Sequence, residues 1–263
     1  MLFTLFLTLM SLLMNSWPPD LGGPNASDDH PKPALNVLVC TATAGYRHDS
    51  IKDSVHALHG LAHAHNFAMT HIESEDERAA SFTDGSLGKF DVIIFLNTTG
   101  DILNDAQQEA MQRFIQRGGG FVGVHAATDT EYGWPWYGQL VGATFLRHPQ
   151  IQLAAIDVVD PSQPSTTHLP KRWQRTDEWY DFHKPPAEGV VILLKLDEST
   201  YEGGSMRGEH PVAWQHEFDG GRAWYTALGH TSESYAEPAF LRHLLGGIFW
   251  AADVPMLAVD EQP

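Results

Sequence analysis

The chain has 263 residues, of which 43% are hydrophobic, so it can form one large α/β core or two small domains. Its formal net charge of −17 argues against nucleic acid and anionic membranes as partners, because both attract a positive surface. The composition favours a protein that binds a neutral or weakly charged small molecule. Histidine is abundant, with 15 residues against 16 lysines and arginines together, and metal binding or acid–base chemistry can produce such an excess.

The first 14 residues, MLFTLFLTLMSLLM, form an apolar run that is short for a membrane span. A tether rich in Pro, Gly, Asn and Asp follows it to about residue 33. This order is typical of a secretory signal, although no Lys or Arg precedes the run and no clear cleavage site follows it. We expect export to the periplasm or the cell exterior; a retained anchor, or a misplaced start codon on a cytoplasmic protein, is the alternative. We expect one folded domain over residues 34–253 and a tail over 254–263.

Apolar patterns place the elements of this domain in chain order. Strands are predicted at 36–41, 67–72, 91–96, 121–124, 151–159, 190–196, 211–218 and 223–228. Helical spacing predicts helices over about 51–62, 104–117 and 241–249. Strands and helices alternate in the first half, which predicts a mostly parallel sheet covered on both faces. The turn Asp219-Gly220-Gly221-Arg222 predicts an antiparallel hairpin late in the chain.

The segment GGGFVGVHAATDT (118–130) is the most informative motif. A glycine cluster, a short buried strand and then His125 before two alanines resemble a nucleophile elbow, with an imidazole in place of serine or cysteine. This limits the chemistry to proton transfer, metal ligation or polar binding. The alternative is a core strand that ends in a hydrogen-bonded histidine. The single cysteine, Cys40, lies in the apolar run VLVCT, which favours a buried thiol over a nucleophile.

Polar residues gather where strands of the predicted sheet end, and ligands bind at that edge of open α/β sheets. The clusters are Tyr46, Arg47, His48 and Asp49; Asn97, Thr98, Thr99 and Asp101; His125, Thr128 and Asp129; and His230, Thr231 and Glu233. Each has a plainer explanation. His48 and Asp49 can cap a helix, and His148 and His210 precede prolines that can simply form turns.

Aromatic residues flank these clusters and suit a sugar ring, which presents apolar C–H faces and polar edges. They are Trp134, Trp136, Tyr137, Trp179 and Tyr180. We expect two or three of the five to be core residues instead.

Several long motifs together resemble the ThuA-like, or trehalose-utilisation, family over residues 36–252. They are GYRHDSI (45–51), GGGFVGVHAATDT (118–130), WPWYGQLVGATFLRHP (134–149), DEWYDF (177–182), HPVAW (210–214) and YTALGHTSESYAEPAFLRHLLGGIFWA (225–251). The resemblance implies a class I glutamine amidotransferase-like fold, a flavodoxin-like α/β sandwich. It also implies a link to disaccharides such as trehalose and their 3-keto derivatives. Amidotransferases carry a cysteine on the elbow, where this chain has His125, so glutamine hydrolysis is not expected.

Two functions remain open. The first is an enzyme of the isomerase, lyase or hydrolase type, in which His125 transfers protons with help from His48 and Glu178, while Asp129 or Glu233 orients an imidazole. The substrate would contact Tyr46, Arg47, Asp49, Asn97, Asp129, Trp136, Tyr137, His148, Trp179, Tyr180, His230 and Glu233. In a variant of this hypothesis His48, His125, His148 or His230 binds a divalent metal such as zinc, although no HExxH motif is present. The second is a non-catalytic sugar-binding or accessory protein. Both leave a homo-oligomer open. Both predict that His48, His125 and at least one of His148 and His230 open into one pocket.

Overall fold

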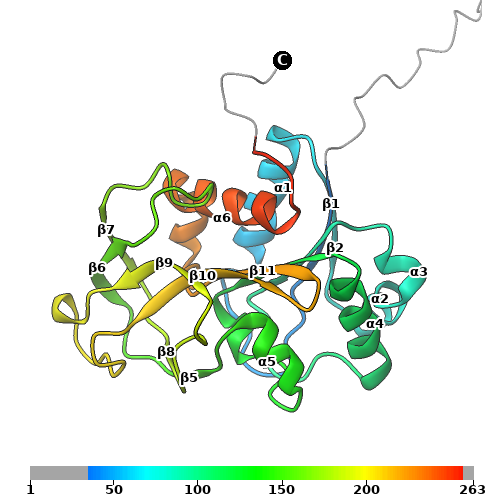
Figure 1. The fold of residues 1–263 in the computed structure, drawn as a ribbon, viewed down its shortest axis with the longest axis horizontal. Coiled ribbons are helices and arrows are strands. Elements are labelled where there is room, and N and C mark those ends of the chain that lie inside the picture. Colours follow the sequence, from blue (N-terminus) through cyan, green and yellow to red (C-terminus); the bar gives the residue numbers. More distant parts are fainter. Residues whose placement is uncertain (1–34, 257–263) are drawn as a thin grey trace, which may run out of the picture. The chain divides into compact units, whose positions relative to one another are not determined.

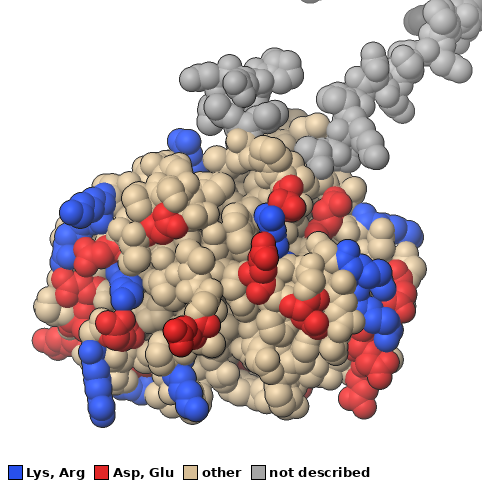
Figure 2. Space-filling model, viewed as in Figure 1, with Lys and Arg blue, Asp and Glu red and all other residues tan. Residues whose placement is uncertain are grey.

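The computed structural model describes residues 35–256, so the signal-like segment predicted at 1–33 and most of the tail predicted at 254–263 lie outside the described residues. No helix in the described part is both long and apolar enough to cross a membrane. Figure 2 shows acidic and basic side chains intermingled on the face in view, without a broad basic surface among the residues coloured there.

A nine-stranded sheet in the order β2-β1-β3-β4-β11-β10-β9-β6-β7 organises the fold (Figure 1). Its strands are β1 (Asn36–Cys40), β2 (Ala68–Ile72), β3 (Val92–Leu96), β4 (Gly120–Val124), β6 (Gln152–Val158), β7 (Arg172–Asp177), β9 (Val191–Leu196), β10 (Pro211–Phe218) and β11 (Gly221–Thr226). Pairs from β2 to β11 are parallel, and pairs from β11 to β7 are antiparallel. Only β10 and β6 run against the other strands, which confirms the mostly parallel sheet. The antiparallel pair of β10 and β11 confirms the late hairpin. A separate pair joins β5 (Phe145–Arg147) to β8 (Asp181–Phe182).

Helices cover both faces of the sheet. The helices α1 (Ile51–Ala64) and α6 (Pro238–Ala251) lie on one face, and α4 (Asp105–Gln116) and α5 (Pro135–Val141) lie on the other (Figure 1). The short helices α2 (Glu75–Ser81) and α3 (Asp84–Leu87) precede β3, and the 3₁₀ turns are η1 (His125–Asp129), η2 (Glu198–Thr200) and η3 (Ser232–Ala236). Asn104 and Gln107 form a capping box at the start of α4.

Close packing of α6 on the sheet depends on a glycine. A Cβ on Gly247 would lie 2.4 Å from the ring of Trp224 on β11, so no larger residue fits there without a shift. Leu244 and Ile248 on the same helix are fully buried, as the apolar spacing predicts. The helix therefore contributes one of the densest parts of the core.

The strand β7 is absent from the sequence prediction because its composition, RWQRTD, is mostly polar. Its inward positions nevertheless alternate as Trp173, Arg175 and Asp177, all buried. The guanidinium of Arg175 lies 4.9 Å from the ring of Trp173 and 4.8 Å from that of Phe240, and it forms an ion pair of 3.2 Å with Asp177. Stacking and pairing thus hold a buried cation that a hydrophobicity pattern predicts to be exposed, although its Nε and Nη1 have no hydrogen-bond partner among the described residues.

We expect Leu244→Ala to lower the free energy of unfolding by about 2–5 kcal/mol, because it removes a fully buried side chain from a packed core. Urea unfolding of the purified chain measures this. Arg242→Ala, an exposed position on the same helix, is the control and should change the free energy by less than about 0.5 kcal/mol. Equal effects of the two substitutions would contradict the described packing of α6.

We expect His243 to make the fold sensitive to acid. Burial lowers its pKa to about 3, although the carbonyl of Ser165, which accepts its Nδ1–H at 2.7 Å, opposes the shift. The unfolded chain therefore binds a proton between about pH 6.5 and pH 3 that the folded chain does not, and stability falls as pH falls through this window.

Urea unfolding at pH 7, 6 and 5 tests this expectation with His243→Gln. The wild type should lose up to about 1.4 kcal/mol per pH unit more than the variant does. His63→Gln, at an exposed position on α1, should leave the wild-type slope in place. A variant as acid-sensitive as the wild type would show that the imidazole of His243 does not carry the effect.

Candidate functional site

Four side chains meet at the carboxyl edge of the sheet: His48, His125, Glu178 and His230. We call them the His–Glu cluster. One ligand-type atom from each lies within 4.8 Å of those of the others. His48 follows β1, His125 follows β4, His230 follows β11 and Glu178 follows β7. His48, His125 and His230 thus lie together at one edge of the sheet, and their opening into a common pocket stays a prediction.

His125 stands at the centre of the His–Glu cluster and is fully buried. Its φ of +49° is left-handed, a strained conformation for a non-glycine residue and one that agrees with the predicted elbow. Its Nδ1–H donates to the carbonyl of Ala227 at 2.7 Å. Its Nε2 lies 3.1 Å from Nδ1 of His230 and 3.4 Å from Oε2 of Glu178. The ring therefore directs one nitrogen lone pair into the cluster whenever it is neutral.

Glu178 links the histidines through both of its oxygens. Oε2 lies 3.1 Å from Nδ1 of His230, and Oε1 lies 3.0 Å from Nδ1 of His148. Burial raises the pKa of Glu178, but the adjacent imidazoles of His125 and His230 outweigh burial and lower that pKa well below its usual range. Burial lowers the pKa of His230, yet its hydrogen bond to Glu178 leaves that pKa raised. The carboxylate is therefore ionised at neutral pH.

His48 closes the cluster on the side of β1. Its ring centroid lies 5.0 Å from that of His125 and 5.1 Å from that of His230. Burial, reinforced by these two neighbours, lowers the pKa of His48 to about 3, so the ring is neutral. Its Nδ1 is buried without a hydrogen-bond partner among the described residues. The exposed ring of Tyr46 meets it edge-on at 4.9 Å.

Asp177, at the end of β7, joins that strand end to the segment that follows β11, next to the cluster. Its fully buried carboxylate accepts the backbone N–H of Glu178 at 3.0 Å, of Gly229 at 2.9 Å and of His230 at 3.1 Å. Gly229 has a φ of +103°, and a Cβ there would meet the hydroxyl of Tyr235 at 2.8 Å. Asp177 is not among the site residues predicted from the sequence; its position directly before Glu178 is the signal that could have found it.

Several residues predicted to bind substrate lie outside the cluster. Arg47 forms an ion pair with Glu73, and Asp49 and Glu233 are exposed on either side. Asn97 is buried with a φ of +53° and donates from Nδ2 to the hydroxyl of Tyr235 at 3.2 Å. It supports the loop that carries His230, and no hydrogen bond joins it to an imidazole of the cluster; its Oδ1 has no partner among the described residues.

Asp129 lies half-buried at the end of η1 and accepts a hydrogen bond from the hydroxyl of Tyr132. Burial raises its pKa, while this hydrogen bond and the nearby His125 and His148 oppose the shift. No hydrogen bond joins it to an imidazole of the cluster, so a role in orienting His125 has no direct contact to support it.

One of the aromatic candidates contacts the cluster. The ring of Tyr180 lies 4.1 Å from that of His125, centroid to centroid, and is nearly buried. Trp179 and Tyr137 are core residues whose polar atoms donate to the carbonyls of Gln152 and Ala127. These two confirm the expectation that part of the aromatic set is structural.

Trp136 and Trp134 lie away from the cluster as well. The indole of Trp136 donates to Asp219 in the β10–β11 turn at 2.9 Å, which is the opposite edge of the sheet. Trp134 stacks on Trp136 with 5.0 Å between ring centroids. Of the five predicted aromatic residues only Tyr180 therefore contacts the cluster, and it is buried; Tyr46, from the polar cluster after β1, is the exposed aromatic ring beside it.

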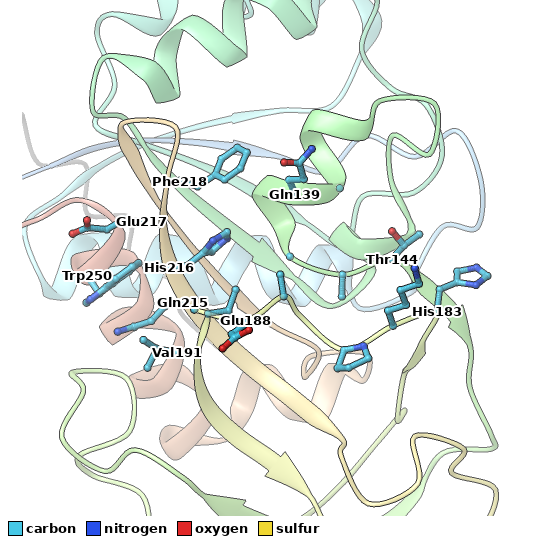
Figure 3. Close-up of a pocket in the computed structure, with 18 residues that line it drawn as sticks. Gln139, Thr144, His183, Glu188, Val191, Gln215, His216, Glu217, Phe218 and Trp250 are labelled. Atoms are coloured by element: carbon cyan, nitrogen blue, oxygen red, sulfur yellow. The ribbon is translucent and has the colours of Figure 1, made fainter.

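A hollow of about 910 Å³ lies elsewhere, between α5, β10 and the segment 183–191 (Figure 3). Among the residues lining it are Gln139, Thr144, His183, His216 and Phe218, and none of the lining residues belongs to the His–Glu cluster. Phe218 pairs with Gly221 at the far end of β11, so the hollow opens toward the opposite edge of the sheet. His216 is already bonded to the carbonyl of Leu140. Among the described residues, those lining the hollow include no group of histidine and carboxylate side chains close enough to share one metal ion.

Cys40 takes no part in the site. It is fully buried on β1, and burial raises its pKa to about 12. A thiol in this state is not nucleophilic at neutral pH, and the elbow carries His125 in place of the amidotransferase cysteine.

Solved structures share this fold. A protein described as ThuA-like from Bacteroides uniformis is 21% identical with a TM-score of 0.70, over 88% of this chain and 95% of that one. A second, from Parabacteroides merdae, is 19% identical with a TM-score of 0.70, over 86% and 93%. A β-galactosidase from Bacillus circulans is 16% identical with a TM-score of 0.56, over 84% of this chain and 31% of that one. These likenesses confirm the predicted flavodoxin-like, amidotransferase-like α/β fold and nothing about activity.

No curated protein matches the sequence. The model of the ThuA family, described as trehalose utilisation, matches residues 36–251, which include all four members of the His–Glu cluster. The chain belongs to the ThuA family.

Proposed function

We propose that this protein is a carbohydrate-active enzyme of the ThuA family and that the His–Glu cluster is its reaction centre. One observation carries the proposal: Nε2 of His125, Nδ1 of His230 and Oε2 of Glu178 converge within 3.4 Å at the carboxyl edge of the sheet. Gathering such groups in a buried place costs stability, and a folded core has no need of them. Their arrangement is what an acid–base or Lewis-acid reaction requires.

The substrate we propose is a disaccharide or a keto-sugar of the trehalose or 3-keto-trehalose type. The family description supports the substrate class, and the high negative charge of the chain suits an uncharged ligand. The exposed ring of Tyr46 beside His48 offers an apolar face to a sugar ring at the mouth of the site. His148, which is half-exposed and bonded to Glu178, offers a polar edge next to it.

The cluster supports proton transfer at a sugar carbon or oxygen, as an isomerase, lyase or hydrolase requires. His125 is its central group, because its tautomer is fixed by the carbonyl of Ala227 and its free nitrogen faces Glu178. The carboxylate stabilises positive charge on His125 or His230, while the neutral ring of His48 borders the same space.

We expect His125→Asn to abolish turnover while leaving the fold intact. Asparagine tolerates the left-handed backbone and keeps a polar side chain, but it cannot accept a proton at neutral pH. The purified full chain is incubated with trehalose or 3-keto-trehalose, and chromatography measures the product formed. His63→Asn, at an exposed position on α1, is the matched control and should retain wild-type turnover.

Three results separate the hypotheses. Loss of turnover in His125→Asn but not in His63→Asn supports the enzyme. Full turnover in His125→Asn contradicts the assignment of the reaction centre. Wild-type protein that binds the sugars in calorimetry but converts none of them favours the non-catalytic sugar-binding function.

We expect Asp177→Asn to lower kcat at least tenfold with little change in KM, because Asp177 positions Glu178 and His230 without touching substrate. An amide would direct an N–H at backbone N–H groups, and the unfolding free energy should fall by about 1–3 kcal/mol. Glu237→Gln is the control, since it weakens the other ion pair of Arg175 and leaves the strand ends tied. Equal losses of kcat in both variants would assign the effect to Arg175 instead.

A further inference from the structure

We propose that His125, His230 and Glu178 bind one divalent transition-metal ion, with zinc the ion that these donors favour. The ligand atoms are Nε2 of His125, Nδ1 of His230 and Oε2 of Glu178. The site stands on its own geometry; only its role in turnover rests on the proposed function. Two imidazoles and one carboxylate with an open position form a common catalytic zinc set.

The spacing of the three atoms fits ligands around one ion. Zinc lies about 2.0–2.1 Å from nitrogen and oxygen ligands, which places tetrahedral neighbours about 3.3 Å apart. The three separations here are 3.1, 3.4 and 3.1 Å. All three atoms are therefore at the distances that a single tetrahedral ion would impose.

The three ligand atoms have too few N–H donors among them for each acceptor to have its own hydrogen bond. The N–H of His125 is already given to the carbonyl of Ala227, so its Nε2 is a lone pair in the neutral ring. That lone pair faces a carboxylate oxygen at 3.4 Å, and both acceptors must share the single Nδ1–H of His230. A cation between the three atoms displaces the Nδ1 proton of His230 to the other ring nitrogen or to solvent, removes this repulsion and pairs with one lone pair on each atom.

The surroundings of the three ligands are those of a metal centre. The bond from His125 to the carbonyl of Ala227 fixes the tautomer that ligation needs, as histidine ligands commonly require. Nδ1 of His148 lies 3.0 Å from Oε1 of Glu178 and 2.9 Å from the carbonyl of Pro149, so His148 borders Oε1 while Oε2 faces the ion. His148 thus acts in this proposal as a partner of a ligand and not as a ligand.

An open coordination position faces His48. This imidazole is 4% exposed, its Nδ1 has no hydrogen-bond partner among the described residues, and one of its ring nitrogens lies within 4.8 Å of the three ligand atoms. It borders the position where water or a sugar oxygen would bind the ion. A bound ion would polarise a keto oxygen or lower the pKa of its water, and that water would then replace His125 as the proton-transfer group.

A second group of similar composition shows the contrast. Asp181, Glu198 and His210 also lie close together, but the chain satisfies their polar atoms. Asp181 accepts from the backbone N–H and hydroxyl of Ser205, and Glu198 accepts from the backbone N–H groups of Met206 and Gly208. His210 bonds to the carbonyl of Tyr180 through Nε2. This group ties loops together and leaves no lone pairs for an ion.

Metal content and zinc affinity of the full chain test the proposal. The chain is purified without added chelator for elemental analysis, then stripped and titrated with Zn²⁺ in a calorimeter. We expect about one ion per chain and a higher unfolding temperature on reloading. Glu178→Gln, which keeps the shape of the side chain, and His125→Ala should each weaken Zn²⁺ binding at least 100-fold. His148→Gln should weaken it about tenfold, as partners of ligands do.

The controls and outcomes separate this site from the proposed reaction. His63→Ala and Glu209→Gln, both at exposed positions, should bind Zn²⁺ as the wild type does. Co²⁺ loaded into the stripped wild type should give the intense visible absorption of a four- or five-coordinate site, and Glu178→Gln should not. Wild type that binds Zn²⁺ no more tightly than Glu178→Gln overturns the metal site, even if sugars are converted. One ion held by the wild type and lost from Glu178→Gln supports it, even if no tested sugar is converted.

Discussion

Asp177 ends β7 with a carboxylate that accepts the backbone N–H groups of Glu178, Gly229 and His230. In the sheet order β7 and β11 are separated by three strands, yet this one side chain joins their ends. The antiparallel half of the sheet must therefore curl back over the parallel half. Arg175 and Ser234 complete the contact, so the charge of the buried carboxylate is balanced. The distances from Glu178 to the imidazoles of the His–Glu cluster depend on this join.

The curl explains why the site draws on both halves of the chain. The parallel strands supply imidazoles at their carboxyl ends, where open α/β sheets present their ligands. The antiparallel extension supplies the carboxylate that those imidazoles lack. A sheet with the parallel half alone would hold three histidines and no anionic partner among the cluster residues. The extension is thus a functional part of the fold and not merely added surface.

The sequence predicts the parallel half well, because apolar strands and amphipathic helices alternate in a pattern that burial alone produces. It also predicts that His48, His125 and His230 share an edge, since each follows a strand of the same direction. It fails for β7, where Arg175 is buried by stacking on Trp173 and Phe240, a contact between residues far apart in the chain. It also fails for Trp136 and Tyr137, since aromatic composition does not say which edge of the sheet a ring lies on.

His125 holds a backbone conformation that costs energy for any residue with a branched or bulky side chain. Glycine or asparagine would relax this strain, so at this position selection for stability and selection for chemistry act in opposite directions. A descendant that no longer needed the imidazole would gain thermodynamically by losing it. Retention of histidine at this turn in a divergent relative is therefore a sign of selection on the reaction centre, and its drift to glycine or asparagine would mark a relative that has kept the fold and abandoned the chemistry.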